Sequence, residues 1–154
     1  MKVAAIQWRS AAWALLALLL SGVFLFAGVM KLREGAPFAG SIARFQLLPE
    51  SFIHPVALGL PILEVFCALA LVIGPWKRPA ALGIVLLCTT FLLALVSAGA
   101  RGLSVECSCF GAVVAEPLGK LIARDLVLLT AAGAIYLRHL GRNLPSVRVR
   151  QMEQ

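Results

Sequence analysis

The chain alternates between four long apolar stretches and shorter, more polar connections. The apolar stretches cover residues 10–33, 52–74, 79–100 and 121–140, and most charged residues lie near their ends or between them. Each stretch approaches the ~20 residues that a helix needs to cross the hydrocarbon core of a bilayer. Helices are expected because a backbone in lipid must satisfy its own hydrogen bonds. The pattern predicts an all-α membrane protein, a four-transmembrane-helix bundle that forms one domain over residues 1–154.

Composition supports this fold class. Of the 154 residues, 61% are hydrophobic and only 14% are charged, and the mean hydropathy is +0.95. A soluble domain of this size leaves roughly a third of its surface wet and has no place for so many apolar side chains. The first stretch is also longer than the ~7–15 residues typical of the apolar part of a signal peptide. We therefore expect it to be a membrane span.

The connections differ in length and character. After the first span, Phe38, Ile42, Phe45 and Leu48 recur at near-helical spacing before a proline. This spacing is typical of a short amphipathic helix that lies in the membrane interface, here on the outer side. The second connection, residues 74–79, contains two prolines and predicts a tight turn between antiparallel helices.

Four spans place both chain ends on one side of the membrane. That side would carry the larger group of basic residues, which comprises Lys2, Arg9, Lys77, Arg78, Arg138, Arg142, Arg148 and Arg150. The positive-inside rule then predicts that both termini lie in the cytoplasm. Residues 141–154 form a basic tail of the kind that lies near anionic lipid headgroups. Membrane lipid is therefore an expected partner, and nucleic acid is not.

The pair Cys107 and Cys109 is the strongest candidate for chemistry. These are the only two of the four cysteines outside the apolar stretches, and one residue separates them. Such close thiols can form a small disulfide ring, and a strained, exposed disulfide is of the redox-active kind. A static disulfide over so few residues closes almost no loop and would stabilise the fold little. The predicted outward position is also where disulfides persist. We predict that Cys107 and Cys109 are the catalytic pair, with the attacking thiol left open.

Other interpretations of the cysteines remain. The pair could be structural or idle, or it could bind Cu(I), because soft thiolates favour that ion. Its spacing is too short for an ordinary zinc site, and no resident metal is predicted. Cys67 and Cys88 lie within predicted spans, where cysteines usually act as small apolar side chains.

Two charged residues lie within or beside the predicted spans. Glu64 is near the middle of the second span, where a carboxyl must be protonated or paired. It could relay a proton, bind a quinone carbonyl, or make a structural contact, for instance with Lys31. Lys31 lies at the outer end of the first span, where snorkelling to the interface is the ordinary explanation. We predict Glu64 and Lys31 as candidate cofactor-binding residues, with quinone as the candidate cofactor.

Three further polar residues have simpler interpretations. Arg124 and Asp125 begin the fourth span, and a salt bridge to a neighbouring helix is expected there. His54, at the outer start of the second span, is expected to be solvated.

The order of several motifs resembles a known family. These motifs are Gly28-x-x-Lys31, Leu63-Glu64, Arg101-Gly102 and Cys107-Ser108-Cys109-Phe110-Gly111. Together they resemble the MauE family of methylamine-utilisation proteins, within the DoxX-like membrane proteins, over about residues 16–136. The family commonly has glycine between the two cysteines, where this chain has Ser108.

The resemblance implies a DoxX-like, four-helix protein of the bacterial inner membrane. MauE is associated with maturing the disulfide-rich small subunit of periplasmic methylamine dehydrogenase, and related proteins exchange electrons with thioredoxin-like partners. We therefore expect a membrane thiol–disulfide oxidoreductase or redox-maturation protein. Its expected partner is a periplasmic thioredoxin-like protein or a maturing periplasmic enzyme. The alternatives are a non-enzymatic assembly factor and a Cu(I)-handling membrane protein.

Overall fold

Four α-helices and one short 3-10 helix make up the part of the protein that the structure describes. The structure is a computed structural model, and it describes residues 2–102 and 117–151. The elements are α1 (Lys2–Arg44), α2 (Glu50–Val72), η1 (Gly74–Trp76), α3 (Lys77–Ala100) and α4 (Leu118–Gln151). The predicted all-α fold is confirmed. Three of the four predicted spans fall within one helix each, and the second, 52–74, extends two residues past the end of α2 at Val72.

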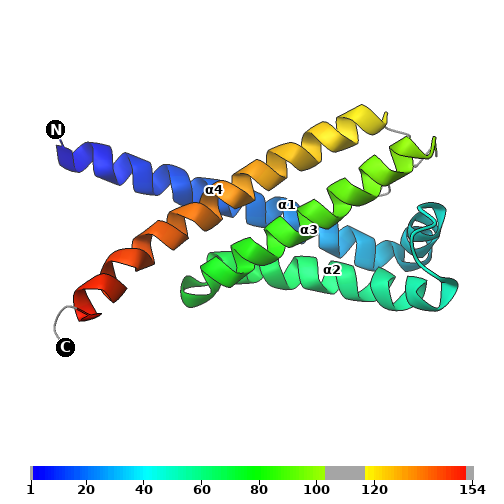
Figure 1. The fold of residues 1–154 in the computed structure, drawn as a ribbon, viewed down its shortest axis with the longest axis horizontal. Coiled ribbons are helices and arrows are strands. Elements are labelled where there is room, and N and C mark those ends of the chain that lie inside the picture. Colours follow the sequence, from blue (N-terminus) through cyan, green and yellow to red (C-terminus); the bar gives the residue numbers. More distant parts are fainter. Residues whose placement is uncertain (1, 103–116, 152–154) are drawn as a thin grey trace.

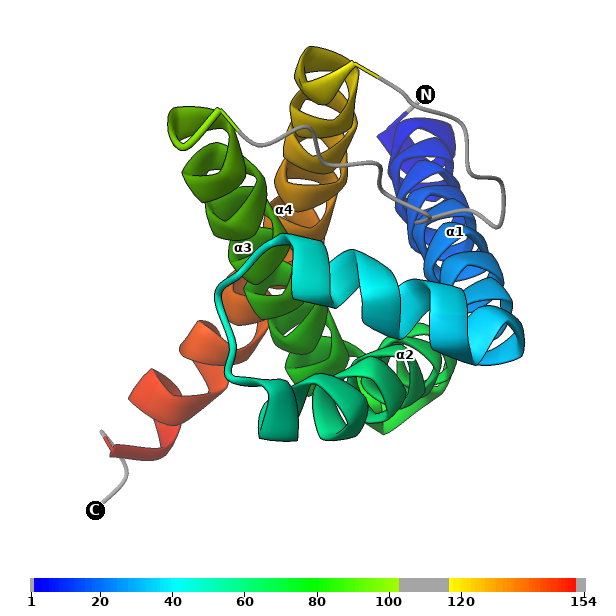
Figure 2. The ribbon, with the colours of Figure 1, turned by 90° about the vertical axis from the view of Figure 1, so that its right-hand side faces the viewer.

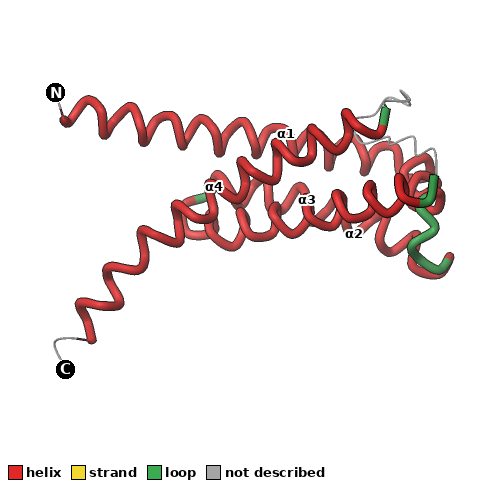
Figure 3. The backbone as a smooth tube through the Cα atoms, turned by 45° about the horizontal axis from the view of Figure 1, so that its top comes forward, coloured by secondary structure: helices red, strands yellow, loops and turns green. Residues whose placement is uncertain are grey.

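The helices run back and forth along one long axis. α2 and α3 are antiparallel and are joined through η1, as the proline-rich turn predicts (Figure 1). α1 packs mainly against α2, and α3 mainly against α4. The start of α1 and the end of α4 extend on the side of the α2–α3 turn (Figure 3). At the opposite end lie the end of α3, the start of α4 and the connection from α1 to α2.

A sharp kink divides α1 into two segments. Gly35 has φ 25° and ψ −79°, which is a non-helical conformation in the positive-φ region that glycine tolerates best. Pro37 follows two residues later, near the start of the second segment, where its missing N–H costs little. The second segment runs to Arg44 and lies crosswise over the end of the bundle (Figure 2). The predicted short helix is therefore present at Phe38 and Ile42, but it ends at Arg44, so Phe45 and Leu48 lie in the connection to α2.

Small side chains occupy the places where the helices approach most closely. Ala68, Ala81 and Ala132 are fully buried, and Leu71 and Ile135 pack around them. Large apolar side chains instead cover the outside of the bundle; those most exposed include Leu58, Phe66, Leu86, Leu93, Val127 and Leu137. Such an apolar exterior is expected where lipid is the solvent and small residues mediate helix contact.

Among the described residues, three helical segments are long and apolar enough to cross a membrane. They are Ala11–Arg44, Glu50–Val72 and Lys77–Ala100. The fourth predicted span lies within α4, but Arg124, Asp125 and Arg138 add charge to it. α4 also continues beyond residue 140 into the predicted basic tail. The protein is therefore a helical membrane protein, and the crossing of α4 stays a prediction.

Gly28 lets α1 approach α2. A Cβ at this position would lie 2.8 Å from Val65 Cγ2 and 3.1 Å from the Pro61 carbonyl oxygen. Gly28→Ala is expected to lower the free energy of unfolding by about 1–3 kcal/mol because the contact becomes overpacked. Unfolding of the purified protein in mixed detergent micelles measures this change.

Gly22, on the same helix, supplies the matched control. Nothing lies within 4 Å of a Cβ built there. Gly22→Ala is expected to be neutral or to stabilise the helix by up to about 1 kcal/mol. Equal destabilisation by both substitutions would contradict the close-packing role of Gly28.

Candidate functional site

The structure describes only two of the four cysteines. Cys107 and Cys109 lie outside the described residues, so their predicted role rests on the sequence. Cys67 and Cys88 are buried free thiols on α2 and α3, as expected for apolar fillers. His54 is exposed in the first turn of α2, as the sequence predicts.

Lys31 and Glu64 form a buried ion pair between α1 and α2. The Lys31 Nζ lies 2.5 Å from Glu64 Oε1, and the two side chains are only 3% and 1% exposed. Gly28 lies one helical turn before Lys31, and a Cβ built on Gly28 would lie 3.3 Å from Glu64 Cβ. The close helix crossing thus brings the two charged side chains together. The pairing alternative for Glu64 is confirmed, and snorkelling of Lys31 to the interface is wrong because a nearer partner neutralises its charge.

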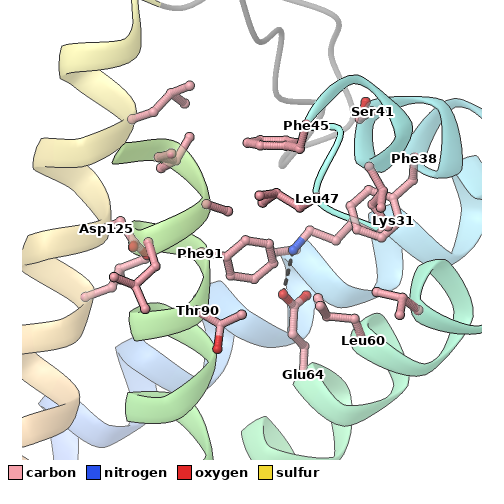
Figure 4. A pocket seen from close by; sticks show the side chains of 18 of the residues that line it. Lys31, Phe38, Ser41, Phe45, Leu47, Leu60, Glu64, Thr90, Phe91 and Asp125 are labelled. Atoms are coloured by element: carbon pink, nitrogen blue, oxygen red, sulfur yellow. Dashed lines mark hydrogen bonds and ion pairs between the residues drawn. The ribbon is translucent and has the colours of Figure 1, made fainter. Parts of the chain in front are cut away.

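Two aromatic rings surround the ammonium of Lys31. Its Nζ lies 4.6 Å from the ring centroid of Phe91 on α3 and 5.5 Å from that of Phe38 (Figure 4). Ring faces attract a cation at this range, most strongly where water is excluded. Phe38 comes from the segment after the kink, so Lys31 links three helices as well as both parts of α1.

A cavity of about 520 Å³ opens beside this pair. Its walls come from all four α-helices and from the connection between α1 and α2. Most lining side chains are apolar, and Phe45, Leu47, Leu60, Phe91 and Leu128 are among them. The charged side chains in its lining are Lys31, Glu64, Arg124 and Asp125. A mainly apolar pocket with a few converging polar groups is the usual form of a small-molecule site.

Two carboxyl oxygens in this lining have unfilled hydrogen-bonding capacity. Glu64 Oε2 and Asp125 Oδ2 are buried, and neither has a hydrogen-bond partner among the described residues. Asp125 is 9% exposed and interacts with the Cys88 thiol of α3 and the charge of Arg124. Buried polar atoms normally have partners, so these two acceptors indicate positions that a ligand or water can fill.

Arg101 connects the end of α3 to the connection between α1 and α2. Its Nη2 donates a hydrogen bond to the Phe45 carbonyl oxygen at 2.6 Å, and its Nε donates to the Ser97 carbonyl oxygen at 3.1 Å. Gly102 then adopts φ 65°, a left-handed conformation suited to glycine at a helix end. The Arg101-Gly102 motif therefore ends α3 and holds one edge of the cavity, where Phe45 lies.

Arg101→Lys is expected to loosen this edge, because one ammonium cannot reproduce the spaced donors of a guanidinium. Losing such hydrogen bonds costs about 0.5–1.5 kcal/mol each. We expect faster amide hydrogen exchange in residues 45–49, measured by mass spectrometry. Arg78→Lys, at an exposed position on the opposite end of α3, is the control and should leave that exchange unchanged. Equal exchange in wild type and Arg101→Lys would contradict the role given to Arg101.

Sequence reasoning identified the two charged residues but missed their aromatic surroundings. Phe91 lies within an apolar span and carries no local signal, and Phe38 was recognised only as part of an amphipathic helix. Asp125 was expected in a salt bridge, whereas its carboxyl also lines the cavity. Phe91 is far from Lys31 and Glu64 in the sequence, and only the packing of α3 brings its ring to the ammonium.

Comparison with known proteins gives a consistent set of relatives. Residues 9–138 match the family described as methylamine utilisation protein MauE. The methylamine utilization protein MauE of Paracoccus denitrificans is 36% identical over 125 residues, which cover 80% of this chain and 67% of that protein. The corresponding protein of Methylorubrum extorquens is 37% identical over 108 residues, which cover 69% of this chain and 58% of the relative.

The protein of the same name from Methylophilus methylotrophus is 34% identical over 88 residues, which cover 56% of this chain and 46% of that protein. The chain thus spans between about half and two thirds of the lengths of these relatives. No solved structure gives a significant match to the chain.

Proposed function

This chain belongs to the MauE family of methylamine utilisation proteins, and we propose that it is a thiol–disulfide oxidoreductase of the bacterial inner membrane. Its Cys107–Cys109 pair exchanges electrons with a periplasmic thioredoxin-like protein. The exchange serves the maturation of a periplasmic enzyme, for which methylamine dehydrogenase is the proposed case.

The observation that carries this proposal is the spacing of the two cysteines. Cys107 and Cys109 stand between α3 and α4 with one small residue between them. A disulfide over this spacing adds little stability but is expected to be strained, and strained disulfides exchange readily. A redox role therefore explains the pair better than a structural one.

The proposed exchange balances without any further reactant. A thiolate of the pair attacks one sulfur of the partner's disulfide, forms a mixed disulfide and releases the other sulfur as a thiolate. The second thiol of the pair then displaces the partner and closes the Cys107–Cys109 disulfide. Two electrons and two protons pass to the partner, which becomes a dithiol. The reverse sequence oxidises the partner and reduces the pair.

The membrane topology that this role needs has α4 as a fourth span and both chain ends in the cytoplasm. The excess of basic residues near the chain ends and the α2–α3 turn supports this orientation. The arrangement of the helices agrees with it, because α1 starts and α4 ends on the side of that turn (Figure 1). The α3–α4 connection would then face the periplasm.

Capture of a mixed disulfide tests the proposal. Cys107→Ser and Cys109→Ser variants, each also carrying Cys67→Ala and Cys88→Ala, are mixed with an oxidised thioredoxin-like protein. We expect one of the two variants to form a covalent adduct that dithiothreitol cleaves by reducing the mixed disulfide. Failure of both to form an adduct, together with full enzyme maturation by the double serine variant, would favour a non-enzymatic assembly factor.

A further inference from the structure

The cavity beside the Lys31–Glu64 pair presents two carboxyl oxygens that accept no hydrogen bond from the residues that the structure describes. Glu64 Oε2 and Asp125 Oδ2 line it, and each belongs to a side chain that is at least nine-tenths buried. Two donors at the same depth point at protein acceptors, and the Lys31 ammonium also faces the rings of Phe91 and Phe38. Lys31 donates to Glu64, and Thr90 donates to the Leu86 carbonyl oxygen of its own helix. A ligand in the deep part of the cavity would therefore find two open acceptors, which a hydrogen-bond donor on the ligand could fill.

We propose that this cavity binds a quinol, a neutral and lipid-soluble ring molecule whose hydroxyl groups donate to the open carboxyl oxygens of Glu64 and Asp125. The binding itself is independent of the cysteine chemistry. A role of the bound quinol in electron transfer rests on the proposed function, in which the quinone–quinol couple would be the second electron carrier. In Figure 4 the ring of Phe91 lies between Asp125 and the Lys31–Glu64 pair, all of which line the cavity.

The charges in the cavity favour a neutral ligand. Lys31 and Arg124 are matched by Glu64 and Asp125, so the lining carries two positive and two negative groups. An organic cation would satisfy the open oxygens but would leave one buried positive charge uncompensated. An anion would face acceptor oxygens that repel it. Because unpaired charges are costly at this depth, only a neutral donor fits both the acceptors and the charge balance.

The lining also favours an aromatic ring with an apolar tail. Phe24, Phe38, Phe45 and Phe91 contribute rings, and most of the remaining lining side chains are aliphatic. Aromatic faces pack well on another ring, and a volume of about 520 Å³ suits a small organic headgroup with the beginning of its tail. A simple fatty alcohol would supply a hydroxyl but would leave the ring contacts unused.

The same geometry distinguishes the reduced from the oxidised ligand. A quinol offers two hydroxyl donors to the open carboxyl oxygens, whereas a quinone offers only carbonyl acceptors. A quinone carbonyl would have to accept from the Lys31 ammonium, which lies between Glu64 and the faces of Phe38 and Phe91, or from Arg124. We therefore expect quinol to bind at least about tenfold tighter than quinone, which corresponds to the ~1.4 kcal/mol typical of a net hydrogen bond.

This preference sets a direction for electron flow. Each tenfold preference for the quinol raises the two-electron midpoint potential of the bound couple by about 30 mV. The site thereby favours the reaction in which a quinone and a dithiol give a quinol and a disulfide, with two electrons and two protons transferred. Within the proposed function, electrons would leave the Cys107–Cys109 dithiol for the quinone.

Direct binding tests the proposal. The full chain in lipid nanodiscs is titrated anaerobically with decylubiquinol and, separately, with decylubiquinone. Three variants accompany it: Ala94→Phe, which fills the cavity; Asp125→Asn, which keeps the shape of the side chain; and Ala123→Phe, an exposed control on α4. We expect tighter binding of the quinol, at least a tenfold loss in Ala94→Phe, a weaker quinol preference in Asp125→Asn and no change in Ala123→Phe.

Several outcomes would overturn the proposal. They are equal affinity for both forms, unchanged binding in both Ala94→Phe and Asp125→Asn, and binding of decanol or decylammonium as tight as that of decylubiquinol. A Cys107→Ser/Cys109→Ser variant separates this proposal from the proposed function, because it should bind quinol normally. If that variant binds quinol and also retains full electron exchange, the cysteine mechanism fails while the quinol site stands.

Discussion

Lys31→Met is expected to destabilise the protein by about 3–5 kcal/mol, because it leaves the carboxylate of Glu64 buried without its partner. The salt bridge is a buried polar contact between α1 and α2, and its ammonium also lies over the rings of Phe38 and Phe91. The loss should appear in the free energy of unfolding in mixed micelles. Lys120→Met, at an exposed position, should stay within about 0.5 kcal/mol of wild type.

The double variant Lys31→Met/Glu64→Gln makes this prediction specific to the ion pair. Removing both charges abolishes the unpaired carboxylate, so much of the lost stability should return. The two single effects should therefore fail to add, as expected for residues in direct contact. Additive losses in the double variant would mean that Lys31 and Glu64 stabilise the fold through separate contacts.

The second large effect concerns the pair Cys107 and Cys109. A Cys107→Ser/Cys109→Ser variant is expected to lose electron exchange with a thioredoxin-like protein entirely, because neither hydroxyl can form a disulfide. The rate is measured with purified protein in nanodiscs and a reduced or oxidised partner. A Cys67→Ala/Cys88→Ala variant is the control and should keep most of the rate, since both thiols are buried. The prediction is contradicted if the Cys107→Ser/Cys109→Ser variant still exchanges electrons, or if only the Cys67→Ala/Cys88→Ala control loses the exchange. Either result would mean that other residues carry out the chemistry.

Hydrophobic patterning predicted the elements of the fold well. Each apolar stretch lies wholly or almost wholly in one helix. The spacing of Phe38 and Ile42 predicted the helical segment after the first span, although this segment ends before Phe45. The helix boundaries were less accurate, because helices can extend beyond the apolar stretch into polar sequence. α1 begins at Lys2, and α4 continues to Gln151. The kink of α1 at Gly35 was also not predicted, since a single glycine can equally occur within a straight helix.

The candidate site was predictable only as isolated residues. Glu64 and Lys31 stand out because charge is costly inside a membrane, but their pairing depends on the crossing of α1 and α2 at Gly28. Side chains from four helices line the cavity, and no local sequence pattern predicts that these side chains come together. Asp125 shows the same difficulty, because a carboxyl near the start of a predicted span usually has a simpler explanation. Its position in the cavity follows from the packing of α3 against α4.

The midpoint potential of the Cys107–Cys109 pair tests the central claim most directly. Purified Cys67→Ala/Cys88→Ala protein is equilibrated with glutathione buffers, and the fraction of free thiol is read by alkylation. We predict one reversible two-electron couple between about −270 and −120 mV, the range of thioredoxin-like oxidoreductases. A disulfide with a potential below about −300 mV would behave as a structural bond. Such a value, or thiols that never form a disulfide, would contradict a role in thiol–disulfide exchange.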